Sequence, residues 1–204
     1  MALGMTTIFS LKGGVGKTSL SGSICLELKN RGLHVPIITN DPISPLEKVF
    51  GSDLALKLPS GKDFPEELET DSEVIMDLGG FVEDRIINLL KKSKIVLVPT
   101  LNDLLSIQGC LSTIHEVKQF NDQIAIIVNR TDKKEFFDIY ELLRDKCPYP
   151  VFLIKQSKAM ENVFIQKLSI SEMMDENPLM KRAYREVNEQ LNKVINFIEG
   201  KSDE

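Results

Sequence analysis

Short apolar runs alternate with longer amphipathic segments along the chain, and this pattern predicts an α/β fold. Several runs contain no polar residue, as expected for parallel strands that are buried on both faces. The sequence predicts strands at residues 6–11, 34–39, 73–78, 95–99, 124–128 and 151–154. The spacing of apolar residues predicts helices after residue 17, at 82–92, 104–120 and 133–146, and over most of the remainder, with breaks at 169–171 and Pro178.

Residues 43–70 interrupt this alternation because they are rich in Pro, Gly, Ser and acidic residues. Their composition predicts a loop with room for one short helix or strand. Elsewhere the alternation favours a doubly wound, mostly parallel sheet flanked by helices. A chain of 204 residues without internal repeats or low-complexity linkers predicts a single domain over residues 1–204.

A phosphate-binding pattern lies between the first predicted strand and the first predicted helix. It consists of Lys12-Gly13-Gly14-Val15-Gly16-Lys17-Thr18, and it departs from the strict P-loop pattern at Leu11, where a glycine is usual. The glycines let the backbone turn tightly and point several N–H groups at one anion, and the helix dipole points there too. Lys17 is predicted to reach the β- and γ-phosphates, and the Thr18 hydroxyl to ligate Mg²⁺.

Two aspartates that follow predicted strands are candidates for the chemistry of phosphate transfer. Asp77 precedes Gly-Gly, at the Walker B position where a carboxylate holds Mg²⁺, usually through water. The alternative is an aspartate that caps the next helix. Asp41 precedes Pro42, where it either orients the attacking water beside the metal or is an ordinary Asx-turn residue. The spacing fits both roles of Asp41 equally.

Lys12 is a second lysine in the loop, one residue before the glycines. From this position it cannot easily reach, within its own subunit, the phosphate that Lys17 contacts. It is therefore a candidate to stabilise transition-state charge across a dimer interface, as an arginine finger does. The alternative is a solvated surface lysine.

These residues resemble the motifs of the ParA/MinD family of P-loop NTPases, which carry a deviant Walker A box. The similar segments are Lys12–Thr18 (Walker A), Asn40–Pro42 (Walker A′), Asp77 (Walker B), Val98-Pro99 and Ile126–Arg130. The resemblance covers about residues 5–175, and the deviant box is its most specific part.

The resemblance implies an ATPase that binds ATP and Mg²⁺ and forms a homodimer with the nucleotides between its subunits. It implies that Lys12 contacts the partner subunit's phosphates, that Asp41 supports hydrolysis and that Asn129 lies near the adenine. The candidate nucleotide-binding residues are Lys12, Gly13, Gly14, Val15, Gly16, Lys17, Thr18, Ser19, Asn129 and Arg130. The candidate metal ligands are Thr18, Asp77 and Asp41.

The sequence departs from the family pattern at two positions of the Walker A′ segment. Thr39 stands where the first aspartate is usual, and Ile43 stands where glutamine is usual. The departures bear on the rate of hydrolysis and on control by partner proteins. They leave the prediction of nucleotide binding intact.

The composition limits what the protein binds. A net charge of −5 excludes a generic nucleic-acid binder, so any DNA contact must come from a local basic patch. Cys25, Cys110 and Cys147 are scattered and read as reduced structural thiols rather than as disulfides, a zinc site or iron–sulfur ligands. With no signal peptide and no apolar stretch long enough to cross a bilayer, the protein is expected in the cytoplasm.

The last segment carries an apolar stripe at helical spacing, formed by Leu191, Val194, Ile195 and Ile198. Its polar side is not rich in lysine and the tail is acidic, whereas a helix that lies on a membrane needs Lys or Arg on its polar face. The sequence therefore predicts a terminal helix that packs on the fold, and it argues against a membrane partner.

ParA-type members resemble one another in binding DNA without sequence preference through basic residues late in the chain. Such contacts need only charge and position. The strongest candidates here are Lys181, Arg182 and Arg185, because residues at i and i+4 share a helix face. The other candidates are Lys155, Lys158 and Lys167.

The chain most resembles a small ParA-type ATPase, which has no DNA-binding domain before the P-loop. This resemblance implies partition of plasmid or other low-copy DNA, a ParB-like centromere-binding partner and association with the nucleoid. One alternative is a MinD-like or other positioning or scaffold ATPase that acts at a membrane or a transfer apparatus. Another is a metabolic ATP-dependent ligase.

Overall fold

A computed structural model describes residues 4–58, 64, 68–69, 71–80 and 84–201. Within these residues a parallel seven-stranded sheet has the strand order β3-β2-β4-β1-β5-β6-β7. The strands are β1 (Met5–Ser10), β2 (Ile37–Thr39), β3 (Ala55–Lys57), β4 (Val74–Gly79), β5 (Ile95–Thr100), β6 (Ile124–Asn129) and β7 (Val151–Ile154). The predicted doubly wound α/β fold is confirmed, and the described strands are all parallel.

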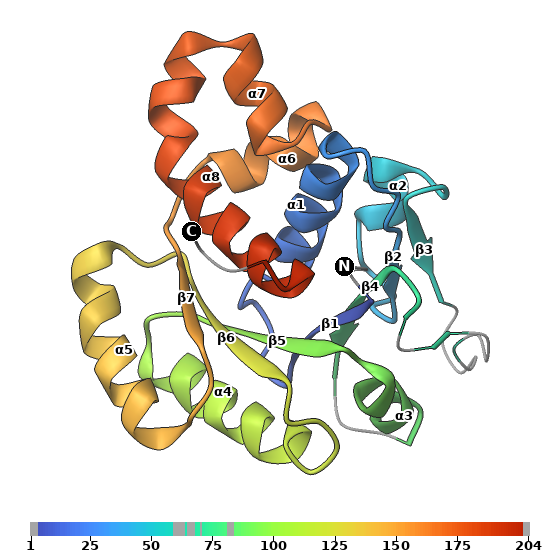
Figure 1. The fold of residues 1–204 in the computed structure, drawn as a ribbon, viewed down its shortest axis with the longest axis vertical. Coiled ribbons are helices and arrows are strands. Elements are labelled where there is room, and N and C mark those ends of the chain that lie inside the picture. The colour runs from blue at the N-terminus through green and yellow to red at the C-terminus, as the bar shows by residue number, and fades with distance from the viewer. Residues whose placement is uncertain (1–3, 59–63, 65–67, 70, 81–83, 202–204) are drawn as a thin grey trace.

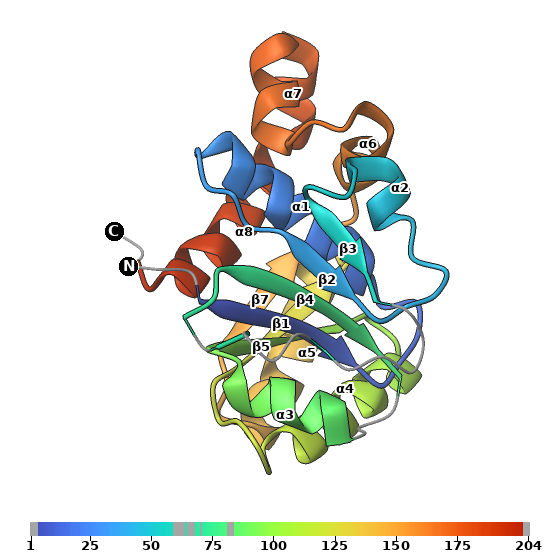
Figure 2. The same ribbon diagram turned by 90° about the vertical axis from the view of Figure 1, so that its right-hand side faces the viewer.

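Helices cover both faces of the sheet (Figures 1 and 2). One face carries α1 (Lys17–Asn30), α2 (Leu46–Phe50), α6 (Ala159–Gln166), α7 (Ile170–Glu176) and α8 (Pro178–Glu199). The other carries α3 (Asp84–Lys92), α4 (Leu104–Val117) and α5 (Lys133–Lys146). Each face has its own apolar core, because the side chains of a strand point alternately to opposite sides.

Most predicted elements are found, with two informative differences. The second strand begins at Ile37 rather than at residue 34, because Pro36 has no N–H to donate and contributes only its carbonyl, which accepts from Ile75. The helix predicted over 104–120 ends at Val117, after which the chain turns and the N–H of Asn121 bonds back to the Val117 carbonyl. Residues 82 and 83 of the helix predicted over 82–92 lie outside the described part.

The loop predicted over residues 43–70 contains both a short helix, α2, and a short strand, β3, which forms one edge of the sheet. Leu46 and Phe50 are buried and anchor α2 on the core. The sequence does not distinguish β3 from the surrounding loop, because the strand has only three residues. Two of these three residues are exposed.

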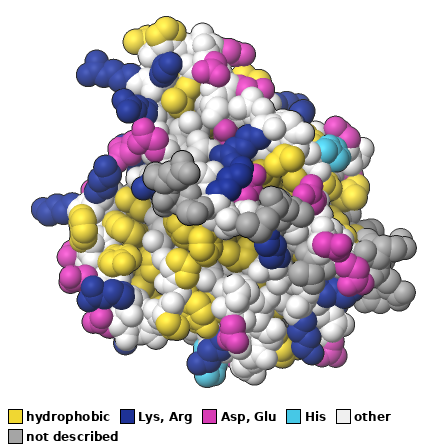
Figure 3. All heavy atoms as spheres, viewed as in Figure 1, with side chains coloured by type: hydrophobic (Ala, Val, Ile, Leu, Met, Phe, Trp, Pro, Cys, Tyr) yellow, Lys and Arg dark blue, Asp and Glu magenta, His cyan; other side chains and the backbone are white. Residues whose placement is uncertain are grey.

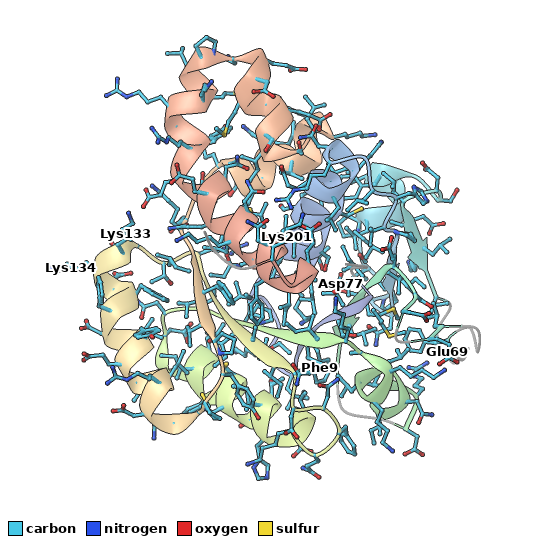
Figure 4. The ribbon with its side chains drawn as sticks, viewed as in Figure 1. Phe9, Glu69, Asp77, Lys133, Lys134 and Lys201 are labelled. Atoms are coloured by element: carbon cyan, nitrogen blue, oxygen red, sulfur yellow. The ribbon has the colours of Figure 1, made fainter. Side chains whose placement is uncertain are left out.

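The last helix packs on the fold as predicted, with its apolar stripe buried. Its end is fastened by Arg31, whose guanidinium donates to Glu199 Oε2 at 2.6 Å and to Asn196 Oδ1 at 3.3 Å. Glu199 also pairs with Lys201, which Figure 4 labels at this end of the helix. Among the described residues, no helix combines the length and the apolar character needed to cross a membrane.

Candidate nucleotide-binding site

The functional candidates gather where the parallel strands end. The phosphate-binding loop follows β1, Asp41 follows β2, Asp77 lies near the end of β4 and Asn129 ends β6. Because β2, β4, β1, β5 and β6 are neighbours with one direction, their carboxyl ends share one edge of the sheet. Ligands of open α/β sheets bind at this edge.

The loop has the backbone that its glycines predict. Gly14 and Gly16 adopt φ values of +79° and +92°, in the left-handed region that side chains rarely enter. Gly16 also passes so close to Asn129 that a Cβ there would lie 2.3 Å from Asn129 Nδ2. Glycine at position 16 is therefore required twice, by its backbone angle and by its neighbour.

Asn129 holds the loop in place. Its Nδ2 donates to the Val15 carbonyl at 3.1 Å, its Oδ1 accepts from the N–H of Arg130 at 3.0 Å, and the residue is buried. This contact joins residues 114 positions apart, and no local sequence pattern predicts it. The adenine contact expected for Asn129 stays a prediction.

Lys17 begins α1, and its side chain lies beside Gly79 at the end of β4. Its Nζ donates to the carbonyls of Ser10 and Lys12, each at 3.3 Å. Burial lowers the pKa of this amine, while the carboxylates of Asp77 and Asp41 oppose that shift. The ammonium group is thus held among loop carbonyls and beside two carboxylates, where an anion that enters the loop gains an attractive charge.

Thr18 and Asp77 form the second part of the site. The Thr18 hydroxyl donates to Asp77 Oδ2 at 3.0 Å, and the buried Asp77 Oδ1 has no hydrogen-bond partner among the described residues. Burial raises the pKa of Asp77 to about 6, against the lowering effects of Thr18 and Lys17. Figure 4 labels Asp77 in the interior of the molecule, among the strands.

This donor set fits Mg²⁺ bound to a nucleotide phosphate. A buried carboxylate with an unpartnered oxygen and a neighbouring hydroxyl supplies the hard oxygen atoms that Mg²⁺ prefers, and a divalent cation compensates the buried charge. Beside them a cavity of about 340 Å³ is lined by Gly13, Lys17, Thr18, Asn40, Asp41, Pro42, Asp77, Gly79 and Gly80. Phosphate groups in this cavity would lie beside the loop, the ammonium group and the carboxylates together.

Asp41 lines the same cavity as Thr18 and Asp77. Its Oδ1 accepts from the N–H of Ile43 at 3.0 Å, and its own N–H donates to Thr39 Oγ1 at 3.2 Å. The first contact is the Asx turn that the sequence left open as an alternative. The second uses the hydroxyl that replaces the usual aspartate at position 39, so Thr39 serves the turn that presents Asp41.

A family model for the CobQ/CobB/MinD/ParA nucleotide-binding domain (CbiA) matches residues 6–170. The chain belongs to this family. It is therefore a P-loop ATPase whose cofactors are ATP and Mg²⁺, as the sequence predicts. A comparison with curated proteins finds no match.

Solved structures of the family share the fold at low sequence identity. Apo McdA from Cyanothece has a TM-score of 0.70 and 16% identity, with 96% of this chain and 98% of that chain covered. The MinD cell division protein of Aquifex aeolicus has a TM-score of 0.69 and 16% identity, with 98% of both chains covered. A plasmid partition protein from Borrelia burgdorferi B31 bound to AMPPNP has a TM-score of 0.58 and 17% identity, covering 81% of this chain and 90% of that chain.

The extra lysine of the CbiA-family loop points away from its own phosphate site. Lys12 is exposed, and its side chain lies along α4, where a Cβ on Gly109 would come within 3.0 Å of Lys12 Cβ. The preceding N–H, of Leu11, donates to Thr113 Oγ1 of the same helix at 3.1 Å. Leu11, which stands where a glycine is usual, thus ties the loop to α4 through its backbone N–H.

A second, smaller cavity of about 80 Å³ adjoins the loop on the side of β6 and β7. Its lining residues are Ser19, Asn129, Arg130, Lys155, Gln156, Ser157, Met160 and Glu161. The structure thus brings together three of the predicted nucleotide-binding residues, Ser19, Asn129 and Arg130. It also brings in Lys155, which the sequence assigned to DNA.

The predicted DNA-binding residues differ in their surroundings. Lys155 Nζ is ion-paired with Glu186, which also pairs with Lys133, and Arg185 pairs with Glu189 at 2.9 Å. The charge of Arg185 is thus balanced by Glu189, whereas Lys133 and Lys155 share the single carboxylate of Glu186. The remaining candidates are exposed: Lys158, Lys167, Lys181 and Arg182.

The cysteines are free and buried, as the sequence predicts for structural thiols. Burial raises the pKa of Cys25 and of Cys110 to about 12 and also raises that of Cys147. Groups of three or more residues suited to hold a metal through His, Cys, Asp or Glu are absent from the described residues.

Asp77→Asn is expected to stabilise the nucleotide-free protein at pH 7.5. The wild-type carboxylate is charged, buried and half-partnered, and a pKa raised from 3.8 to about 6 corresponds to about 3 kcal/mol. We expect a rise in Tm of at least about 3 °C, measured by thermal unfolding. In the wild type this penalty is absent below the unfolded-state pKa and develops as the pH rises through the folded-state value, so the difference should shrink from pH 7.5 to pH 5.5.

The control for this prediction is Asp138→Asn, which changes an exposed aspartate of α5. It should leave Tm within about 1 °C, since surface substitutions change stability little. A lower Tm for Asp77→Asn than for the wild type would show that the bond from Thr18 outweighs the cost of the buried charge. In that case the unpartnered Oδ1 of Asp77 would not indicate a cation site.

Proposed function

We propose that this chain, as one P-loop ATPase domain over residues 1–204, is a ParA-like partition ATPase. ATP brings two copies together, the dimer binds DNA without sequence preference, and a ParB-like centromere-binding protein stimulates hydrolysis and release. The protein thereby moves or positions plasmid or other low-copy DNA in the cytoplasm, on the nucleoid. The plasmid partition protein of B. burgdorferi among its structural relatives supports this branch of the family.

The observation that carries the proposal is the exposed Lys12 at an edge with exposed apolar side chains. Ile43 follows β2 and is 87% exposed, while Leu104 and Leu105 follow β5 and are about two-thirds exposed. All three lie beyond carboxyl ends of strands, as the nucleotide site does. Exposed large apolar groups around a site favour burial against another protein surface, and an outward lysine can then reach a phosphate in the partner subunit.

Lys12→Ala is expected to leave nucleotide binding by the monomer within about threefold and to abolish the ATP-induced dimer. Its ammonium group makes no ion pair with the described residues of its own subunit, and its charge acts on the exposed Asp103 at the start of α4, which does not line the nucleotide cavity. Its loss should therefore change nucleotide binding by the monomer little. Light scattering at several protein concentrations, with ATP and with ADP, measures the change. Dimers of unchanged stability would identify Lys12 as an ordinary surface lysine.

Within one subunit, the proposed hydrolysis uses residues that already line the cavity. The loop N–H groups and the Lys17 ammonium would hold the phosphates, and Thr18 with Asp77 would hold the metal. When bound, Mg²⁺ would supply positive charge that offsets the charge of the phosphate groups. Asp41 accepts a hydrogen bond from the attacking water and orients it. Lys12 of the partner adds the charge that stabilises the leaving phosphate oxygens.

The proposed DNA surface is the start of α8, with Lys181 and Arg182 at its centre. Both side chains are exposed, and the structure gives neither of them an ion pair among the described residues. This part of the helix projects beyond the sheet together with α7, and Figure 3 shows dark blue Lys and Arg side chains on that end of the molecule. Two such surfaces in a dimer double the number of phosphate contacts.

The test is binding to random-sequence duplex DNA at several salt concentrations, with ATP, with ADP and without nucleotide. We expect binding only with ATP and a steep loss of affinity with salt. Lys181→Ala/Arg182→Ala should weaken binding at least about tenfold and flatten the salt dependence. The matched control is Lys118→Ala/Lys146→Ala, which removes two exposed lysines from the ends of α4 and α5 and should bind as the wild type does.

A second candidate, a MinD-like positioning or scaffold ATPase, is favoured by one feature of the same projecting end. Leu179 is 80% exposed beside Lys181 and Arg182, and an apolar side chain with flanking cations also suits an anionic membrane surface. Absence of DNA binding in every nucleotide state, with ATP-dependent binding to anionic liposomes, would replace the partition function with this one.

A further inference from the structure

Asn40 joins the ends of two strands at the nucleotide cavity. Its Nδ2 donates to the Gly79 carbonyl at 3.0 Å, and its Oδ1 accepts from the Gly79 N–H at 3.0 Å. Both hydrogen-bonding groups of one backbone unit are thus satisfied by one side-chain amide. Asn40 comes directly after β2, and Gly79 is the last residue of β4.

These two bonds continue the ladder between β2 and β4 beyond its last backbone pair. The Ile75 N–H donates to the Pro36 carbonyl, so alternate residues of β4 from Ile75 onward turn their backbone groups toward β2. In the register Thr39 lies opposite Asp77, where β2 ends. Gly79 is next in this series, and the amide of Asn40 takes the place that a further peptide group of β2 would occupy.

Gly79, which Asn40 holds through these two bonds, lies beside the side chain of Lys17. A Cβ on Gly79 would lie 3.3 Å from Lys17 Cε and 3.6 Å from Lys17 Nζ. The next residue, Gly80, has φ +98° and turns the chain away from the strand. Asn40, Gly79 and Gly80 line the same cavity as Asp41, the residue that follows Asn40 in sequence.

We propose that Asn40 is a positioning residue for ATP hydrolysis, which fixes Asp41 and the Gly79 backbone relative to each other across the phosphate cavity. Asp41 acts on the attacking water from the end of β2, whereas Lys17 and Asp77 hold the phosphate and the metal beside β4. The backbone ladder between β2 and β4 ends at Thr39 and Asp77. Asn40 extends the connection to Gly79, which lies beside Lys17. This inference rests on the hydrolytic part of the proposed function and is independent of DNA binding.

Loss of the two Asn40–Gly79 hydrogen bonds should slow ATP hydrolysis and leave the affinity for ATP nearly unchanged. The phosphate-binding loop is held by Asn129 and by α4, neither of which Asn40 contacts. Ground-state affinity for ATP should therefore survive. Hydrolysis needs the attacking water, Asp41 and the phosphate in one geometry, and a misplacement of about 1 Å can reduce a rate about 10²-fold.

The test compares Asn40→Ala with Asn121→Ala. Asn121 makes the same kind of contact at the opposite edge of the sheet, where its Nδ2 donates to the Leu90 and Ser93 carbonyls and its Oδ1 accepts from the Gln123 N–H. Single-turnover hydrolysis and the equilibrium affinity for a fluorescent ATP analogue are measured for both variants. Asn40→Ala should slow hydrolysis about 10- to 100-fold with affinity within about threefold, and Asn121→Ala should change the rate by less than about twofold.

A second variant and readout test the geometry without nucleotide. Asn40→Asp keeps an acceptor for the Gly79 N–H and loses the donor to its carbonyl. Hydrogen exchange followed by NMR should show a Gly79 amide that is protected in the wild type and in Asn40→Asp and exchanges faster in Asn40→Ala. Protection in Asn40→Ala equal to that of the wild type would overturn the proposal.

Two kinetic results would also overturn the proposed role of Asn40. Wild-type hydrolysis by Asn40→Ala would show that the connection to Gly79 is not needed, and an equal loss of affinity and rate would show a merely structural role. Failure of the partition function has a different signature, because a protein that hydrolyses ATP but never binds DNA would leave the split between rate and affinity in Asn40→Ala unchanged.

Discussion

Lys17→Ala is expected to lower the affinity for ATP by at least about 10²-fold. The ammonium group lies between loop carbonyls and beside the carboxylates of Asp77 and Asp41, so its contacts with phosphate oxygens form in a partly desolvated place. Hydrogen bonds to charged groups contribute about 1.5–3 kcal/mol each, and two of them account for a loss of 10²-fold or more. Isothermal titration of the variant with ATP in excess Mg²⁺ measures the change.

The control for Lys17→Ala is Lys29→Ala, in the last turn of the same helix and exposed. It removes one positive charge from the protein and leaves the loop untouched, so its affinity for ATP should equal that of the wild type. Circular dichroism establishes that both variants are folded. Retention of wild-type affinity by folded Lys17→Ala would refute the assignment of the phosphate site.

Asp41→Ala is expected to reduce ATP turnover by about 10²- to 10⁴-fold, the range that positioned general bases contribute. ATP should still bind, because the loop, Lys17 and Thr18 are unchanged, and removal of a carboxylate from the cavity lessens the repulsion of phosphate. The variant should therefore accumulate as an ATP-bound dimer. Steady-state phosphate release together with size-exclusion chromatography in ATP measures both effects.

Asp138→Ala is the matched control for Asp41→Ala, since it removes an exposed aspartate of α5 far from the strand ends. Its turnover should equal that of the wild type. The bond from the Ile43 N–H to Asp41 Oδ1 makes the opposite outcome informative. Normal turnover by Asp41→Ala would assign this residue to the turn alone and would leave the orientation of the water to another group.

Local sequence patterns predict most of the helices and strands of the fold. Helix α5 and strand β7 have the predicted bounds. The helix begins after the N-cap Asp132 and ends before Pro148, and the strand is a continuous apolar run between Pro150 and Lys155. The strand after α1 was predicted too long, since the apolar residue Val35 extends the pattern past Pro36, which cannot donate to the ladder. The bounds of β3 cannot be predicted from the sequence, because its three residues are too few to show a strand period and lie within a segment rich in Pro, Gly, Ser and acidic residues.

The sequence predicts the parts of the site that are formed by consecutive residues. It predicts less well the parts that are formed by residues from distant segments. The loop from Lys12 to Thr18 can be read directly, and the contact between Thr18 and Asp77 follows from strand order. The clamps made by Asn129 and Asn40 depend on tertiary approach, and a single asparagine has no pattern. Likewise, charge alone made Lys155 a candidate for DNA, whereas the fold pairs it with Glu186.

The unpartnered oxygen of Asp77 has a consequence for how long the protein survives in a cell. A buried carboxylate without a cation lowers the stability of the empty form, whereas a ligand at 100 times its Kd adds about 2.7 kcal/mol to the stability of the bound form. Cellular proteases remove chains in proportion to the fraction that is unfolded. We therefore expect the abundance of this ATPase to fall when a starved cell runs short of ATP, even with its synthesis unchanged.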